Sequence, residues 1–129
     1  MHVLPLAHAR AWIAASTLLV AAVVYASLGP SVPAPDVDNF DKLEHAVAYL
    51  CLTLWFTGLV LRSRYGRVAL ALALFGLVIE FLQEFMPFGR QGDPLDMAAN
   101  LVGIGVGLAI ASVATGGWAL KVEAWLNRT

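Results

Sequence analysis

The sequence is poor in charged residues and in cysteine. Only 13% of its 129 residues are charged, whereas 60% are hydrophobic. A soluble domain typically has about 25% charged residues, so this chain lacks the charge that would cover a water-facing surface. The net charge of −1 excludes a nucleic-acid partner, because too few basic residues remain to neutralise a run of phosphates. The single cysteine, Cys51, excludes an intrachain disulfide.

What the sequence has instead is long apolar stretches. A helix that crosses the ~30 Å hydrocarbon core of a bilayer needs roughly 17–25 residues. Four stretches of this kind predict spans at 11–28, 43–61, 68–86 and 95–115. The last stretch, 117–129, is too short to span and mixes tryptophans with charged residues, which is typical of a tail at the membrane interface. We therefore expect an all-α, polytopic membrane protein with one domain, a four-helix transmembrane bundle.

The basic residues predict the orientation of this bundle. Six of the eight would lie on one side of the membrane (Arg10, Arg62, Arg64, Arg67, Lys121 and Arg128) and two on the other (Lys42 and Arg90). Basic residues favour the cytoplasmic side, so both termini are expected to be cytoplasmic. The first span also has features of a signal peptide, with Arg10 before an apolar run and Val24-Tyr25-Ala26 as a cleavage site. Its apolar core exceeds the usual signal length, which favours an uncleaved signal anchor.

Polar residues recur at helical spacing near the outer end of the second span. Asp41, His45 and Tyr49 are four residues apart and share one helix face. Asp41 to Glu44 also has the form of a capping box, so Asp41 has a structural explanation as well as a chemical one. His45 is either a satisfied interior residue or an acid/base or ligand group beside a carboxylate.

The third span carries Glu80 and Gln83 on one face. Glu80 lies about 9 Å along the helix from Met86, too deep for a solvated end. A buried glutamate must pair or take up a proton. Candidate partners are His45 and Arg90, and a purely structural ion pair is the alternative. Arg90, between two loop glycines, could bridge carboxylates or bind an anionic ligand bidentately.

The fourth span begins at a predicted cap. Asp93 before Pro94 predicts an N-cap with proline at the first helical position. Asp96 then lies in the first turn, where its negative charge stabilises the helix by interacting with the helix dipole. Asn100 lies one turn deeper on the same face. The Gly103–Gly107 spacing on that face is typical of close helix packing, and it leaves a homodimer possible.

Taken in order, these residues resemble the VanZ-like family of small bacterial membrane proteins. The resemblance covers roughly 41–107 and consists of Asp41-Lys42-x-x-His45-x-x-x-Tyr49, Glu80-x-x-Gln83, Arg90 and Asp96-x-x-x-Asn100-x-x-Gly103. It implies a multi-pass protein of the bacterial cytoplasmic membrane. It also implies a link to resistance against teicoplanin, a lipoglycopeptide that acts at the outer membrane face, but it specifies no biochemical activity.

Three hypotheses follow for the function. In the first, the outer end binds or acts on an amphiphilic ligand in the bilayer, such as a lipid-linked envelope precursor or a lipoglycopeptide. In the second, the polar groups form an internal network that fixes the helices of a non-enzymatic membrane module. The third, ion transport, is disfavoured because the inner halves of the spans carry no ionisable residue. Candidate catalytic residues are His45, Glu80, Asp41 and Asp96, and candidate ligand-binding residues are Lys42, Tyr49, Gln83, Arg90 and Asn100.

The sequence identifies no cofactor and leaves enzymatic activity open. It contains no zinc-protease ligand spacing and no nucleophile elbow. No metal-ligand set is therefore assigned from the sequence, although Asp41, His45, Glu80 and Asp96 could together hold a divalent ion that bridges to phosphate.

Overall fold

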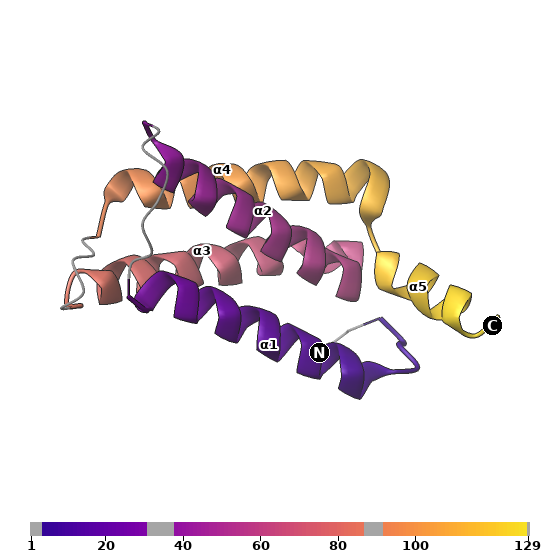
Figure 1. The fold of residues 1–129 in the computed structure, drawn as a ribbon. Helices are drawn as coiled ribbons and strands as arrows, with labels where there is room; N and C mark the ends of the chain where they lie inside the picture. Colours follow the sequence, from indigo (N-terminus) through magenta and orange to yellow (C-terminus); the bar gives the residue numbers. More distant parts are fainter. Residues whose placement is uncertain (1–3, 31–37, 87–91, 129) are drawn as a thin grey trace.

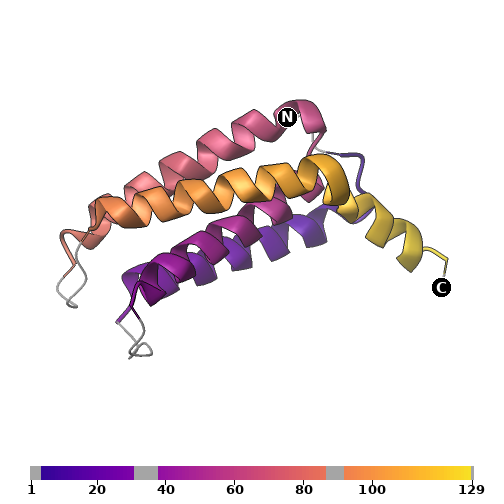
Figure 2. The ribbon, with the colours of Figure 1, turned by 90° about the horizontal axis from the view of Figure 1, so that it is seen from above.

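A computed structural model describes residues 4–30, 38–86 and 92–128, and these residues form helices and connecting turns without a strand. Four long helices lie lengthwise beside one another, and a shorter fifth helix leaves the bundle at the end where the two termini lie (Figures 1 and 2). The helices are α1 (Ala9–Leu28), α2 (Phe40–Leu59), α3 (Tyr65–Gln83), α4 (Pro94–Ile110) and α5 (Trp118–Leu126), with a short 3-10 helix η1 (Arg62–Arg64) and a π-helical turn η2 (Ala111–Thr115).

The expected all-helical fold is confirmed, and three segments are long and apolar enough to cross a membrane. They are Ala9–Leu28, Arg62–Gln83 and Pro94–Thr115. The second expected span, 43–61, is not among them, although α2 is 20 residues long. The reason is its polar beginning, since Asp41, Lys42, Glu44 and His45 fall within its first two turns.

The outer surface of the bundle is apolar. Large side chains such as Leu18, Phe81 and Val113 are 71%, 63% and 86% exposed. A large exposed apolar surface is unfavourable in water, and it is what a helix presents to lipid. The exposed residues therefore agree with the composition in indicating a membrane protein.

The closest helix packing is between α2 and α4. A Cβ atom at Gly107 would lie 2.7 Å from Thr53 Cβ, and one at Gly103 would collide with the backbone oxygen of Ala46. The predicted packing role of the two glycines is confirmed. Because α2 of the same chain occupies this glycine face, the face is not available for contact between two copies of the chain.

At the other end of the bundle, α5 is fixed to the beginning of α1. The Glu123 carboxylate accepts hydrogen bonds from the backbone N–H groups of Ala7 (2.7 Å) and His8 (2.8 Å) and from Trp12 Nε1 (2.9 Å). Burial opposes the charge of Glu123, but these donors outweigh it and lower the pKa of the carboxyl. The expected interfacial tail is thus a helix packed onto the chain, with Trp125 64% exposed.

Candidate functional site

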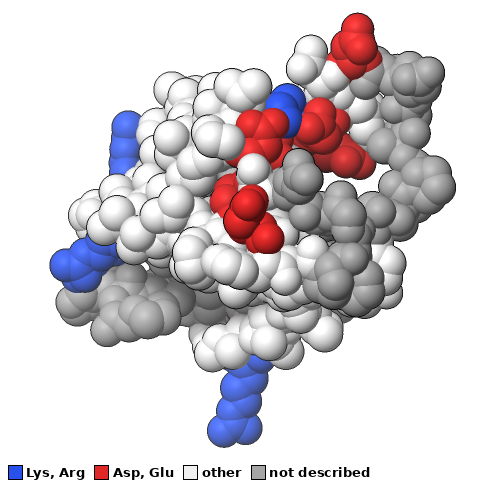
Figure 3. All heavy atoms as spheres, turned by 90° about the vertical axis from the view of Figure 1, so that its left-hand side faces the viewer, with Lys and Arg blue, Asp and Glu red and all other residues white. Residues whose placement is uncertain are grey.

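The predicted site residues come together where α2 and α4 begin and α3 ends. His45 lies one turn into α2, Glu80 lies near the last turn of α3, and Asp96 lies in the first turn of α4. Figure 3 faces this end of the bundle and shows several acidic side chains grouped on it. Residues 31–37 before α2 and 87–91 between α3 and α4, which include Arg90, lie outside the described residues.

The local sequence explains how α4 begins but not how α2 begins. Asp93 is the N-cap of α4, with Pro94 following it, and its side chain accepts from Leu95 N at 2.8 Å. That prediction is confirmed. The capping box on α2 is wrong, because the N-cap is Asn39, in the left-handed conformation at φ 59°. Asp41 lies within the first turn, and its carboxylate pairs with Lys42 instead.

Lys42 gathers three carboxylates from two helices. Its Nζ lies 2.6 Å from Asp41 Oδ2, 2.6 Å from Asp93 Oδ2 and 2.5 Å from Asp96 Oδ1. The hydrogen bonds from Lys42 lower the pKa of Asp41 and of Asp93. The ammonium group is therefore engaged within the chain, where it joins the first turn of α2 to the first turn of α4.

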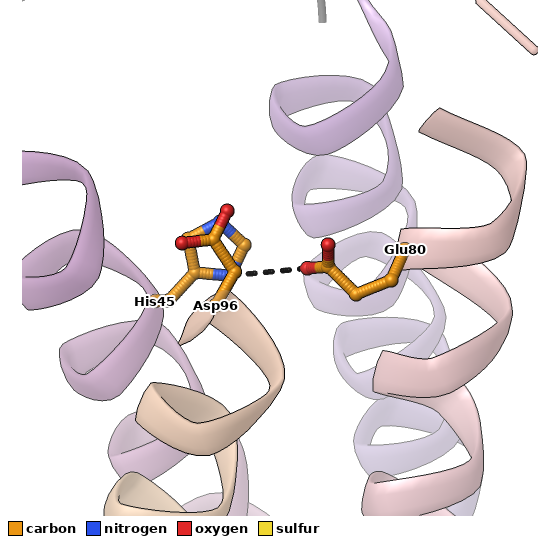
Figure 4. A group of neighbouring side chains, drawn as sticks. All are labelled: His45, Glu80 and Asp96. Carbon is orange, nitrogen blue, oxygen red and sulfur yellow. Dashed lines mark ion pairs between the residues drawn. The ribbon is translucent and has the colours of Figure 1, made fainter. Parts of the chain in front are cut away.

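His45 lies between the carboxylates of Glu80 and Asp96. Its Nε2 is 3.4 Å from Asp96 Oδ2, and its Nδ1 is 3.8 Å from Glu80 Oε1 (Figure 4). Nδ1 also makes a 3.0 Å hydrogen-bond contact with Asn100 Oδ1. We call His45, Glu80, Asp96 and Asn100 the His45 cluster.

Each carboxylate of the His45 cluster has one oxygen held by the protein and one directed at the ring. Glu80 Oε2 accepts from the backbone N–H of Asp93 at 3.1 Å, and Asp96 Oδ1 pairs with Lys42. The remaining oxygens, Glu80 Oε1 and Asp96 Oδ2, face His45. Among the described residues, Glu80 Oε1 has no hydrogen-bond donor although its side chain is only 9% exposed.

Two further polar atoms without a described partner adjoin the cluster. Asn100 Nδ2 and Tyr49 OH each lie 3.0 Å from the point that a Cβ of Gly76 would occupy. Asn100 is fully buried and Tyr49 is 3% exposed. A side chain larger than that of glycine at position 76 would therefore crowd both polar groups.

Gln83 lies apart from the cluster. Its side-chain nitrogen donates to the backbone oxygen of Ser27 at 3.0 Å, which joins the end of α3 to the end of α1. A cavity of about 540 Å³ between α1, α2 and α3 is also separate, since it is lined mainly by apolar residues with Arg64 and Arg67 and contains no residue of the cluster.

Sequence reasoning missed the second role of Asp93. It identified the cap, but Asp93 also pairs with Lys42 and donates its backbone N–H to Glu80. The sequence did contain a signal for this pairing. Lys42 and Asp93 each lie at the beginning of a helix, and these two helices run in the same direction in the bundle.

The arrangement supports two kinds of chemistry. An imidazole beside two buried carboxylates can accept and donate protons, and the same donor atoms can bind a metal ion. Comparison with protein-family models, curated proteins and solved structures gave no match for the chain. Its function is therefore argued from the geometry of the His45 cluster.

Proposed function

We propose that the chain is a VanZ-like, multi-pass protein of the bacterial cytoplasmic membrane whose polar end binds an amphiphilic cell-envelope ligand at the outer leaflet. In this proposal α2 is the fourth membrane span and both termini are cytoplasmic. The observation that carries the proposal is the convergence of His45, Glu80 and Asp96 from three helices at one end of an otherwise apolar bundle. Ionisable residues in such spans are costly, and by default they mark a functional site.

The surroundings of the cluster suit a ligand with a polar head and an apolar chain. Asp41 and Asp93, with side chains 58% and 38% exposed, form a polar rim outside the buried cluster. The outer faces of the helices below this rim expose apolar side chains. A lipid-linked envelope precursor or a lipoglycopeptide would place its head group at the rim and its chain along the helices.

The alternative function is a membrane module whose polar groups only fix the helices. Lys42, with its three carboxylates, supports it. However, a network that serves packing alone is expected to satisfy its buried polar atoms. Glu80 Oε1, Asn100 Nδ2 and Tyr49 OH have no hydrogen-bond partner among the described residues. These three atoms favour a site that receives a ligand.

The test uses purified protein in detergent and two probes, teicoplanin and the same glycopeptide without its acyl chain. We expect the acylated probe to bind at least about tenfold more tightly, because the acyl chain adds apolar burial. Glu80→Gln should weaken this binding, whereas Glu84→Gln, at the exposed C-cap of α3, should not. Absence of binding by the acylated probe, or equal binding to Glu80→Gln, would contradict the proposal.

Thermal unfolding of the same variants separates the two functions. If Glu80→Gln loses binding without a fall in its unfolding temperature, the ligand site is supported. If binding and unfolding temperature fall together, and both recover when the variant is stabilised by lipid, the structural module is favoured.

A further inference from the structure

The contacts of His45 determine which of its ring nitrogens is free. The amide oxygen of Asn100 can only accept a hydrogen bond, so the 3.0 Å contact places the ring proton on Nδ1. A neutral imidazole then has its lone pair on Nε2, where Asp96 Oδ2 lies 3.4 Å away. Two lone pairs that face each other repel unless a proton or a metal ion lies between them.

The distance between these two atoms suits a shared metal ion. Ligand atoms bound tetrahedrally at about 2.0–2.1 Å from an ion are about 3.3 Å apart. Glu80 approaches the ring from the Nδ1 side, where its Oε1 lies 3.8 Å from that nitrogen. One donor atom each from His45, Glu80 and Asp96 lie within 4.8 Å of one another, so the Glu80 carboxylate is close enough to supply a third ligand. The Glu80 side chain is 9% exposed, and its Oε1 has no hydrogen-bond donor among the described residues.

The groups around these three ligands hold them in place. Asn100 orients the His45 ring through Nδ1, Lys42 takes the second oxygen of Asp96, and the backbone of Asp93 takes the second oxygen of Glu80. Metal-binding histidines almost always donate their other ring N–H in this way, and ligating carboxylates are themselves hydrogen-bonded.

The neighbouring acidic group cannot hold the ion in the same manner. Asp41, Asp93 and Asp96 also approach one another closely enough for a metal site. The Lys42 ammonium, however, lies within 2.6 Å of an oxygen of each of them and already occupies the space between them. This leaves the side of Asp96 that faces His45.

We infer that His45, Asp96 and Glu80 together bind one divalent transition-metal ion, such as Zn²⁺ or Mn²⁺, at the polar end of the bundle. A nitrogen ligand with two carboxylates favours these ions over Ca²⁺ and Mg²⁺, which prefer oxygen ligands alone. Three protein ligands leave a coordination position for a phosphate or carboxylate oxygen of the ligand. In this respect the inference rests on the proposed function, because it names how that ligand would be held.

The ion can be tested on the wild-type chain with Co²⁺, whose visible absorption reports its coordination. Protein treated with EDTA is titrated with Co²⁺, and Zn²⁺ is then added to displace it. We expect one equivalent of Co²⁺ with an absorption band that Zn²⁺ removes and that excess Ca²⁺ leaves in place. A wild-type chain that gives no such band overturns the inference, whatever the variants do.

Variants assign the ligands. His45→Gln, Glu80→Gln and Asp96→Asn should each raise the dissociation constant of Zn²⁺ at least about tenfold. His8→Gln, at the opposite end of the bundle, and Glu84→Gln should leave the Zn²⁺ constant unchanged. Thermal unfolding shows whether each variant is folded. An unchanged Zn²⁺ constant in folded His45→Gln overturns the assignment.

Teicoplanin binding, measured with EDTA and with Zn²⁺, separates this inference from the proposed function. If Co²⁺ binds but teicoplanin does not bind in either condition, the ion stands and the proposed function fails. If teicoplanin binds equally in both conditions and Co²⁺ gives no band, the proposed function stands and the ion fails. Tighter teicoplanin binding with Zn²⁺ supports both.

Discussion

Lys42 shows how a single residue can stabilise several charges near the membrane. An ammonium has three N–H donors, and each of the three carboxylates around Lys42 can take one of them. Two of these carboxylates belong to the beginning of α4, so the lysine joins two helices as well as neutralising charge. The donors of an arginine lie in one plane, so they would not reproduce the arrangement of three carboxylates around one nitrogen.

The first prediction concerns the loss of this ammonium. Lys42→Met retains the apolar stem but leaves Asp41, Asp93 and Asp96 without their shared cation. We expect the free energy of unfolding to fall by about 1–3 kcal/mol, the usual cost of leaving a buried polar group unpaired, because Asp96 is the buried member of the three. Thermal or denaturant unfolding in detergent measures it, with Lys121→Met, an exposed lysine on α5, as the matched control. Equal stability of the two variants would contradict a structural role for Lys42.

At this scale the sequence predicted the members of the site better than their partners. Spacing by four placed Asp41, His45 and Tyr49 on one face, and depth along the third span singled out Glu80. The partners of Gln83 and Asp93 depend on how α1 and α4 are placed against α3, which local spacing does not contain. Asp41 was misread as an N-cap because residues 41–44 fit the pattern of a capping box and equally allow an ion pair between Asp41 and Lys42.

At the scale of elements, the contact of α2 with α4 determines where His45 meets Asp96 and Asn100. Gly103 brings the two backbones together, whereas Gly105, on the same helix, has no atom within 4 Å of a Cβ built on it. Gly103→Ala should therefore cost about 1–3 kcal/mol of unfolding free energy through overpacking. Gly105→Ala should change stability by about 0.5 kcal/mol or less. Thermal unfolding in detergent compares the two, and equal effects would contradict the packing of α2 on α4.

The contact of α5 with the beginning of α1 gives a pH-dependent prediction. The pKa of Glu123 is lowered in the folded chain, so its contribution to stability is complete above its unfolded pKa of about 4.3. This contribution is lost as the pH falls through the lower folded value. His8, whose Nδ1 lies 3.5 Å from the carboxylate, is the titratable group facing it, and its charge favours the ionised carboxylate.

Tryptophan fluorescence can follow this transition, because the rings of Trp12, Trp55 and Trp118 pack together beside Glu123 with centroids 5.4–5.9 Å apart. We expect an acid-dependent change in emission below pH about 4.3 for the wild type. Glu123→Gln should remove that phase, while Glu44→Gln, an exposed glutamate at the other end, should keep it. The same pH midpoint in wild type and Glu123→Gln would show that another group causes the transition.

At the scale of the whole molecule, hydropathy predicted the helical bundle with bounds that differ from the structure by a few residues. α2 is the informative exception. The apolar part of α2 is long, but the polar residues of the site make the helix as a whole less apolar than a membrane span usually is. The same residues that point to a function thus obscure the topology, so the fourth span and the orientation are matters for experiment.

The orientation can be tested by labelling single cysteines. In a Cys51→Ser background, Asp38→Cys would report the polar end of the bundle and Ser63→Cys the turn between α2 and α3. Six of the eight basic residues lie at the end that contains Ser63, so we expect that end to face the cytoplasm. A membrane-impermeant maleimide should label Asp38→Cys in intact spheroplasts and Ser63→Cys only after permeabilisation. The reverse pattern would place the His45 cluster in the cytoplasm and remove the outer-leaflet ligand. Labelling of both cysteines at the same face would instead show that α2 does not span.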